Sequence, residues 1–318
     1  MHAILLFITA IIWGLAFVAQ SSGGDTAGPF TFNCIRSLLG SAVLVPVFLI
    51  FDRGKDKERY DRKTLVKAGV ICGVLMFFAS NTQQLGINLG CDAGKAGFIT
   101  ATYILMVPVF GLFLKKKCGW NVWLAVFLAL VGLYMLCLKT GTGGIGIDDA
   151  LVLLCAVCFT VHILTVDHFS PKVNGVKLSC IQFLVSGTLG IIPSFFLEVG
   201  TDSVSQRVWL SHLMTADAWI PILYAGIMSC GVAYTFQIIG QKGTDPAVAS
   251  LIMSLESVFA ALGGALILGE RMTADELMGC CFMFAAIILA QIKFKRSRKG
   301  NDGAGSGQTA NLENESRL

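Results

Sequence analysis

The sequence predicts an all-α integral membrane protein with ten transmembrane helices, built as two inverted repeats of five helices each. The first observation is composition: of 318 residues, 55% are hydrophobic and 14% are charged, with a mean hydropathy of +0.73. A soluble domain carries about 25% charged residues. The second is a series of apolar segments long enough to cross a bilayer, and the third is an internal repeat. A chain so poor in charge cannot cover a surface that faces water, so its solvent is lipid.

A transmembrane helix needs about 20 mostly apolar residues. The first such segment resembles a signal peptide, but it lacks a positively charged start and further spans follow at once, so we expect it to be retained. The predicted spans cover residues 3–20, 30–51, 65–85, 94–114, 120–138, 148–167, 177–197, 218–240, 245–268 and 274–292.

Several boundaries of these spans are marked by residue type. Asp92 and Asp245 each precede the start of a span, which is typical of a capped helix N-terminus. The connections 115–119 and 269–273 are very short, so the spans that they join form antiparallel hairpins. Pro108 interrupts the fourth span and predicts a kink there.

The distribution of Lys and Arg predicts the orientation. The connections on the side of the N-terminus hold 17 Lys and Arg residues, at 53–63, 115–117, 172–177, 242 and 293–299. The opposite connections hold only Lys139, Arg207 and Arg271. Cytoplasmic loops are enriched in Lys and Arg, so we expect a multi-pass protein of the plasma membrane with both termini in the cytoplasm.

Composition also excludes several kinds of partner. The basic residues crowd into loops and form no stripe interleaved with aromatic residues, so no nucleic-acid partner is expected. Most of the 11 cysteines lie in apolar runs, where they pack between helices, and we predict neither a metal nor a cofactor. Residues 300–318 are rich in Gly, Ser, Asn and Glu, and we expect a disordered cytoplasmic tail there.

The sequence of the first half recurs in the second. Residues 33–38 (NCIRSL) match 179–184 (SCIQFL) at an offset of 146. At an offset of 153, Gln84 pairs with Gln237, Gly90 with Gly243, Asp92 with Asp245, Ala96 with Ala249, and Gly111 with Gly264. The predicted repeats are 1–140 and 141–299. Because each holds five spans, the second enters the membrane from the opposite side, which makes the topology inverted.

An inverted repeat favours a secondary transporter, since two mirrored halves can open to either face at similar energy. No P-loop motif occurs, so the driving force is a proton gradient or the substrate gradient alone. One alternative is a membrane-embedded enzyme acting on lipid. Only Asp148 and Asp149 form an adjacent acidic pair near a span, and the four His form no HExxH motif, so we do not expect an enzyme. Another alternative, a receptor or assembly subunit, would not need the repeat.

Short motifs along the chain resemble the EamA domain of the drug/metabolite transporter superfamily. They are Trp13-Gly14, Phe17, Pro29 and Arg36 in its opening part, and Pro108, Gly111, Leu268-Gly269-Glu270 and Gly279 in its closing part. The resemblance covers residues 3–292 in two copies. It implies ten helices and movement of metabolites by alternating access, often export, without ATP. Phe159-Thr160 replaces Trp13-Gly14 in the second copy, so the two halves differ in part.

Ionisable side chains inside a bilayer cost about 2.5–3.5 kcal/mol at a helix centre, so each suggests a function. Glu256 lies near the middle of its span, and its repeat counterpart is Tyr103 at the same depth. Both are expected where the halves meet, which is the usual place for a transported substrate. Glu256 could exchange a proton during transport, or it could make a structural hydrogen bond to a neighbouring helix.

Three further residues are candidates for the translocation pathway. Arg36, near the outer end of the second span, could bind a substrate carboxylate, pair with Asp25, or reach the lipid headgroups. His162, in the inner half of the sixth span, could titrate or simply pack. Trp13 in the first span could stack on a substrate or pack.

Two polar clusters occupy mirrored places. Asn81, Gln83 and Gln84 lie at the outer end of the third span, whereas Tyr234 and Gln237 lie at the inner end of the eighth. Such clusters suit gates, although interhelical hydrogen bonds of about 0.6 kcal/mol each would explain them equally. One acid, one Arg, amides and aromatic rings together suit a zwitterion such as an amino acid, or an amphipathic metabolite. The expected partners are therefore this small molecule, protons and the lipid bilayer.

Overall fold

The computed structural model describes residues 1–51, 61–91, 93–116, 118–137, 146–200, 202–267 and 273–291. The predicted cap at Asp92 and the predicted tail 300–318 lie outside these residues. In the described part of the first predicted repeat, the helices are α1 (His2–Ala27), α2 (Pro29–Phe51), α3 (Arg62–Asn88), α4 (Ala93–Ala101), α5 (Tyr103–Phe113) and α6 (Trp120–Cys137).

In the second repeat, the described helices begin with α7 (Ile147–Phe169), η1 (Ser170–Lys172), α8 (Gly175–Ser194), η2 (Phe195–Val199) and α9 (Ser203–Leu213). They continue with α10 (Ala216–Leu223), η3 (Tyr224–Ala233), α11 (Tyr234–Gln241), α12 (Pro246–Met253), α13 (Glu256–Ile267) and α14 (Ala274–Gln291). The η2 and η3 segments are π-helices that continue the α-helices before them.

The prediction of an all-helical membrane protein is confirmed. The described residues contain no strand, and helices occupy all ten predicted spans. Within the described ranges, seven helical segments are long and apolar enough to cross a membrane, and two shorter apolar helices cover His2–Phe17 and Trp120–Met135. The count of ten membrane crossings stays a prediction.

Two predicted spans are broken at equivalent places. Residues 94–114 divide into α4 and α5 at Thr102, and residues 245–268 divide into α12 and α13 at 254–255. α5 continues through Pro108, so the break in this span lies six residues before the proline. The kink at Pro108 stays a prediction. Tyr103 and Glu256 are the first residues after the two breaks.

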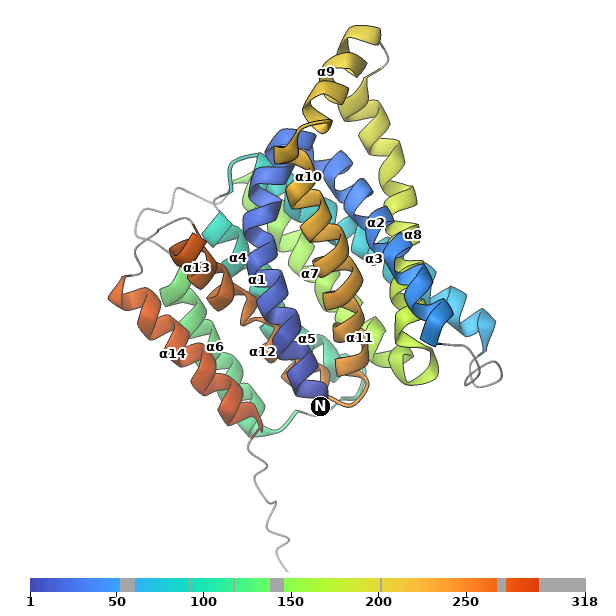
Figure 1. Ribbon diagram of the computed structural model, residues 1–318. Coiled ribbons are helices and arrows are strands. Elements are labelled where there is room, and N and C mark those ends of the chain that lie inside the picture. The colour runs from blue at the N-terminus through green and yellow to red at the C-terminus, as the bar shows by residue number, and fades with distance from the viewer. Residues whose placement is uncertain are drawn as a thin grey trace, which may run out of the picture.

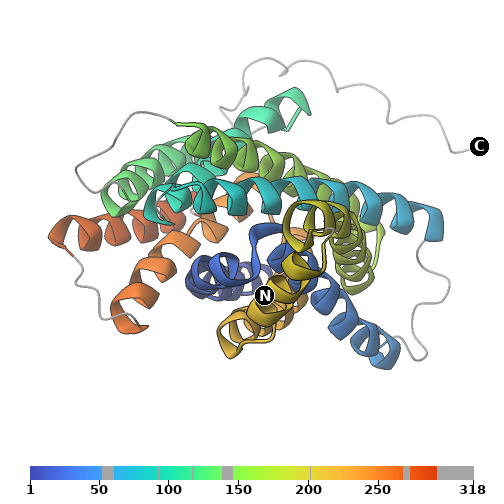
Figure 2. The ribbon, with the colours of Figure 1, turned by 90° about the horizontal axis from the view of Figure 1, so that it is seen from above.

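The helices of the two halves interlock in a repeated pattern. The first helix of one half, α1, packs on α10, η3, α11 and α13 of the other, and α7 packs likewise on α3, α4 and α5. Equivalent helices also pair with each other, α2 with α8 and α6 with α14. Figures 1 and 2 show α1 beside α10 and α11 from two directions. Most of the interior is therefore an interface between the halves.

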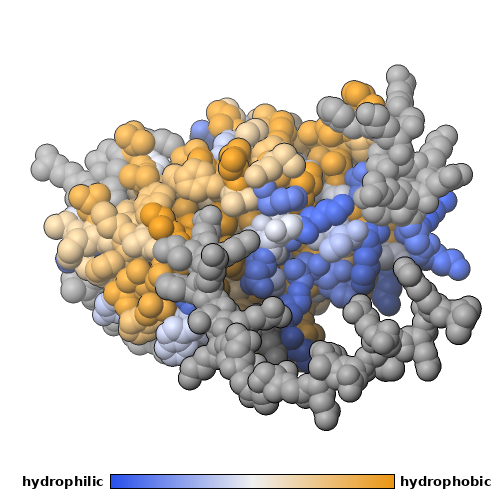
Figure 3. Space-filling model, turned by 90° about the horizontal axis from the view of Figure 1, so that it is seen from below, coloured by the Kyte–Doolittle hydropathy of each residue, from blue (hydrophilic) through white to orange (hydrophobic). Residues whose placement is uncertain are grey.

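The two ends of the molecule differ in character. The lower end in Figure 1 holds the start of α1, the α5–α6 turn, η1 and the α11–α12 turn, while α9 projects from the upper end. Lys115, Lys172 and Lys242 are exposed in the turns of the lower end. Seen from below, the described surface divides into an apolar and a hydrophilic area (Figure 3).

One helix, α9, was not predicted. Its 11 residues carry an Arg, a His and a Gln among the apolar positions, so it lacks the length and hydropathy of a span. Asp202 caps its N-terminus, since the side chain accepts hydrogen bonds from the backbone N–H groups of Val204 and Ser205. The connection between the seventh and eighth predicted spans is therefore a structured hairpin.

This hairpin anchors the first turn of α2. The carboxylate of Glu198 accepts hydrogen bonds from the backbone N–H groups of Phe30 (2.7 Å) and Thr31 (2.6 Å). The Thr31 hydroxyl accepts a bond from the indole N–H of Trp209 on α9 (3.1 Å). Glu198 thus satisfies N–H groups that the start of a helix leaves without partners.

Replacing Glu198 with alanine is therefore expected to destabilise the protein. Two N–H groups lose their acceptor, which predicts a loss of about 1–2 kcal/mol in the free energy of unfolding. Thermal unfolding of the purified protein in detergent measures this loss. Glu198→Gln keeps one acceptor oxygen and should lose less. Equal melting temperatures for wild type and Glu198→Ala would contradict the capping role.

Candidate functional site

A polar cavity lies where helices of both halves meet. It is lined from the first half by Trp13, Phe17, Gln20, Arg36, Gln83, Thr100 and Tyr103, and from the second by Phe159, Ile163, Ser229, Tyr234, Gln237, Met253 and Glu256. About 40 Å³ is open to the centres of water molecules. One water needs roughly 10–15 Å³ by this measure, so the cavity has room for a few waters or a small solute.

The helix breaks place one pair of side chains in the lining of this cavity. The hydroxyl of Tyr103 donates a hydrogen bond of 3.1 Å to the carboxyl group of Glu256. Both residues are buried, and each begins a half-helix. Discontinuous helices of this kind are where transporters place substrate and ion sites.

Arg36 enters the same cavity from the second turn of α2. Its side chain is 6% exposed, and its guanidinium carbon lies 5.3 Å from the centre of the Phe32 ring. Among the described residues no carboxylate lies within ion-pair distance of Arg36. The predicted pairing with Asp25 involves a side chain outside the described set. Burial of Arg36 argues against the predicted alternative that it reaches the lipid headgroups.

An aromatic wall closes one side of the cavity. The rings of Trp13 and Tyr234 lie 4.6 Å apart between centroids, and Phe183 packs on Tyr234 at 5.0 Å. Tyr234 belongs to the helix that continues η3, and Thr9 of α1 donates a 3.0 Å hydrogen bond to the Ala233 carbonyl at the end of η3. Segments of π-helix are frequent at functional sites.

Several polar atoms of the lining lack partners. Buried polar groups in proteins are normally hydrogen-bonded, so these atoms are available to a bound solute or to water. Within the described part of the chain they are Trp13 Nε1, Gln20 Oε1, Arg36 Nε and Gln237 Oε1. The cavity therefore offers donors, acceptors, a cation and an acid in one enclosed place.

Six of the nine predicted site residues line this cavity, namely Trp13, Arg36, Tyr103, Tyr234, Gln237 and Glu256. Tyr234 and Gln237 lie in its wall, although we predicted them at an inner mouth. Sequence reasoning missed Gln20, Thr100 and Ser229, which also line it. They are small or uncharged residues in apolar helices, and nothing in their spacing distinguishes them from packing residues.

The other three predicted residues lie behind the lining. His162 is fully buried, and its Nε2 lies 3.1 Å from the side-chain oxygen of Gln182. Asn81 accepts a hydrogen bond from Asn33 at 3.2 Å, and Gln84 donates to the backbone carbonyl of Gln20 at 3.1 Å. These contacts join neighbouring helices, as in the alternative interpretation of the polar clusters.

The acidic pair at the start of α7 forms a cluster with Cys91. One potential ligand atom from each of Cys91, Asp148 and Asp149 lies within 4.8 Å of the others. Asp149 also accepts a 3.2 Å hydrogen bond from the backbone N–H of Gly146, and a 3.4 Å contact from the Cys91 thiol. We interpret the cluster as a helix cap that ties the end of α3 to α7.

Gly14 fixes the position of Glu256 relative to α1. A Cβ atom at Gly14 would lie 2.5 Å from the Cβ of Phe259 and 2.7 Å from the backbone oxygen of Glu256. The backbones of α1 and α13 therefore touch directly beside the cavity. This contact is a physical reason for the glycine in the Trp13-Gly14 motif.

We expect Gly14→Ala to destabilise the protein. The added methyl group must push α1 away from α13, and overpacking of this kind costs about 1–3 kcal/mol. Gly97→Ala is the matched control, because nothing lies within 4 Å of a Cβ built there. Thermal unfolding should show a lower melting temperature for Gly14→Ala only. A similar value for both variants would mean that the helices have room to adjust.

The chain is similar to known transporters along most of its length. Residues 1–138 and 147–291 each match the EamA-like transporter family. The chain is 28% identical to an uncharacterized transporter of Archaeoglobus fulgidus, over 91% of this chain and 85% of that protein. It is 25% identical to the threonine/homoserine exporter RhtA of Escherichia coli K12, over 93% and 92%.

A solved crystal structure has a similar fold, with a TM-score of 0.72 at 18% identity, covering 91% of this chain and 96% of that one. The matched family and the named relatives are transporters, not enzymes.

Proposed function

The chain belongs to the EamA-like transporter family, and on this premise we propose that it is a secondary transporter of a small zwitterionic amino acid. The observation that carries the proposal is the presence of Arg36 and Glu256 in one buried cavity without an ion pair between them. Burying a charge costs free energy unless a partner compensates it. An amino acid supplies both partners, a carboxylate for the guanidinium and an ammonium group for the carboxyl.

The remaining lining supports a small, polar substrate. Arg36 presents a planar fork of N–H donors that suits a carboxylate, and the unpaired oxygens of Gln20 and Gln237 can accept hydrogen bonds from an ammonium or hydroxyl group. Relatives named threonine/homoserine exporter support an amino acid with a hydroxyl side chain, carried outward. We therefore propose threonine-like substrates and export.

Alternating access would use the two halves, 1–140 and 141–299, as inverted units of five spans. The equivalent breaks before Tyr103 and Glu256 and the repeated packing pattern support this arrangement. The concentration of Lys at the lower end supports a cytoplasmic position for that end, and hence for both termini, in the plasma membrane. We propose that Glu256, which is hydrogen-bonded to Tyr103, takes up and releases one proton for each substrate molecule that is transported.

Uptake into proteoliposomes tests the proposal. Purified protein is reconstituted, and radiolabelled threonine, homoserine and other amino acids are offered with and without a pH gradient. Saturable uptake of hydroxylated amino acids above that of empty liposomes, increased by the gradient, is the expected result. Uptake of non-zwitterionic amphiphiles, without uptake of any amino acid, would contradict the proposed substrate class. The family membership would stand.

A further inference from the structure

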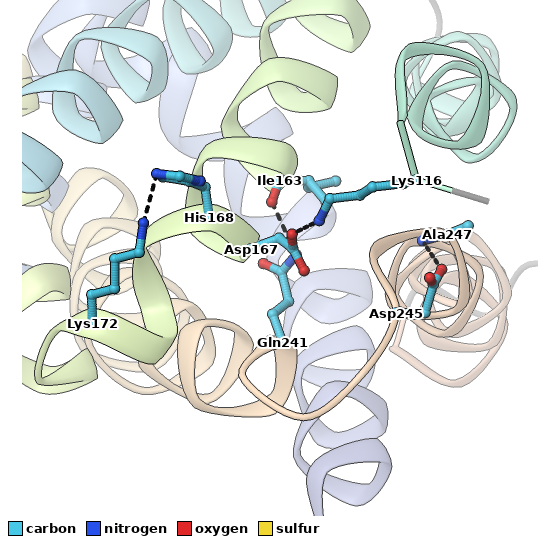
Figure 4. A network of polar contacts seen from close by, with 8 residues as sticks. All are labelled: Lys116, Ile163, Asp167, His168, Lys172, Gln241, Asp245 and Ala247. Atoms are coloured by element: carbon cyan, nitrogen blue, oxygen red, sulfur yellow. Dashed lines mark hydrogen bonds and ion pairs between the residues drawn. The ribbon is translucent and has the colours of Figure 1, made fainter. Parts of the chain in front are cut away.

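An ion pair at the lower end of the molecule joins the two halves. Lys116, in the turn after α5, binds the carboxylate of Asp167 near the end of α7 (Figure 4). The side chain of Lys116 is 33% exposed and that of Asp167 is 15% exposed. The pair is therefore shielded from water more than an ordinary surface ion pair.

The ion pair lies one helical turn below the floor of the cavity. Ile163 lines the cavity, and Asp167 follows four residues later on α7. On α11, Gln237 lines the cavity and Gln241 follows at the same spacing. The side-chain amide of Gln241 donates a 3.2 Å hydrogen bond to the Ile163 carbonyl (Figure 4). This bond joins α7 to α11, so the residues one turn below the cavity form a connected layer.

A second acid faces the same lysine. Asp245, which caps α12, lies in this layer (Figure 4). Burial lowers the pKa of Lys116, and the negative charge of Asp245 opposes part of that lowering. The lysine of the first half therefore faces acids on α7 and on the α11–α12 turn, both of the second half. Separating the halves at this end would expose these charges and break their contacts.

The sequence has no equivalent pair at the upper end. At the repeat offsets, the counterpart of Lys116 is Gly269 and that of Asp167 is Ser21, and neither is charged. The upper end also differs at the cavity, where Gln20, Arg36 and Gln83 form the lining toward that side. The Lys–Asp pair is thus present at these repeat positions of one end and not at those of the other.

We propose that Lys116 and Asp167 form a one-sided lock that holds the cavity closed toward the lower end, and that opening to this side requires their separation. The inference rests on the alternating access in the proposed function. For an exporter that loads its substrate from the cytoplasm, the lock would set how often an empty transporter opens to receive it.

Access to the cavity floor from each side tests the lock without any substrate. Ile163→Cys serves as the reporter, in a Cys118→Ser background because Cys118 lies two residues from Lys116. Vesicles of either orientation are treated with a membrane-impermeant maleimide. Lys116→Gln and Asp167→Asn should each speed labelling from the lower end by about fivefold, because each removes the same ion pair.

The double variant and a neighbouring lysine provide the controls. Lys116→Gln with Asp167→Asn should label no faster than the faster single variant, since only one contact is lost. Lys115→Gln removes an exposed charge next to the lock and should label as wild type does. Raising the salt concentration should speed labelling of the reporter protein that keeps the lock, by screening.

Unchanged labelling in both single variants, with melting temperatures like that of wild type, would overturn the proposal. So would fully additive effects in the double variant, which would show that the two residues act independently. Because no substrate is added, the result does not depend on whether threonine or another compound is transported.

Discussion

Replacing Arg36 with glutamine is expected to reduce the affinity for an amino acid substrate by at least about 30-fold. Loss of one partner from a buried, hydrogen-bonded charge pair costs about 2–5 kcal/mol, and 1.4 kcal/mol is a factor of ten. The guanidinium group is buried and has no carboxylate partner among the described residues. We therefore expect the substrate carboxylate to be its main electrostatic partner. Substrate-induced thermal stabilisation or equilibrium binding measures the loss.

The melting temperature separates binding from folding in this variant, and two further variants provide comparisons. Arg36→Gln removes an unpaired buried charge, so the melting temperature without substrate should stay equal or rise. Arg36→Lys keeps the charge but loses the planar fork of donors, and should recover only part of the affinity. Arg207→Gln, on the exposed face of α9, is the matched control and should bind normally. Normal binding by Arg36→Gln would remove Arg36 from the site.

Glu256→Gln is expected to abolish the dependence of transport on the pH gradient. Exchange of one proton per substrate permits about tenfold accumulation per pH unit, and glutamine cannot take up or release a proton at this position. The amide keeps an oxygen for the substrate ammonium group, so exchange of substrate without a gradient should continue, with weaker affinity. Uptake into proteoliposomes under imposed pH gradients measures both properties.

The control for this variant is Asp275→Asn, an exposed acid in the first turn of α14. It should accumulate substrate as wild type does. If Glu256→Gln accumulates substrate to the same extent, the carboxyl group is a structural partner of Tyr103 and another group must exchange the proton. If uptake does not respond to the gradient even in wild type, transport follows the substrate gradient alone.

The architecture was largely predictable because membrane helices are specified by local composition. Length and hydropathy located the spans, and the repeat offset of 153 paired Tyr103 with Glu256 before any contact was known. These signals depend only on the order of residues along the chain, so a single sequence is enough to detect them. The family resemblance was confirmed by the match to both halves.

The details of the site were less predictable, because the side of a helix that faces a cavity depends on packing. The composition of α7 does not show that Ile163 lines the cavity while the adjacent His162 does not. The helix breaks at Thr102 and Ser254 carry no proline or glycine that would mark them. The Lys116–Asp167 contact joins residues 51 positions apart, and no local pattern indicates it.

Recognition of both charges of a zwitterion is the central claim, and competition by modified substrates tests it most directly. Uptake of radiolabelled threonine is measured with excess unlabelled threonine, its methyl ester, which lacks the carboxylate, or N-acetylthreonine, which lacks the ammonium group. Arg36 and Glu256 predict that threonine competes strongly and that each derivative competes far more weakly. Equal competition by either derivative would show that the corresponding charge is not recognised, and would contradict the claim.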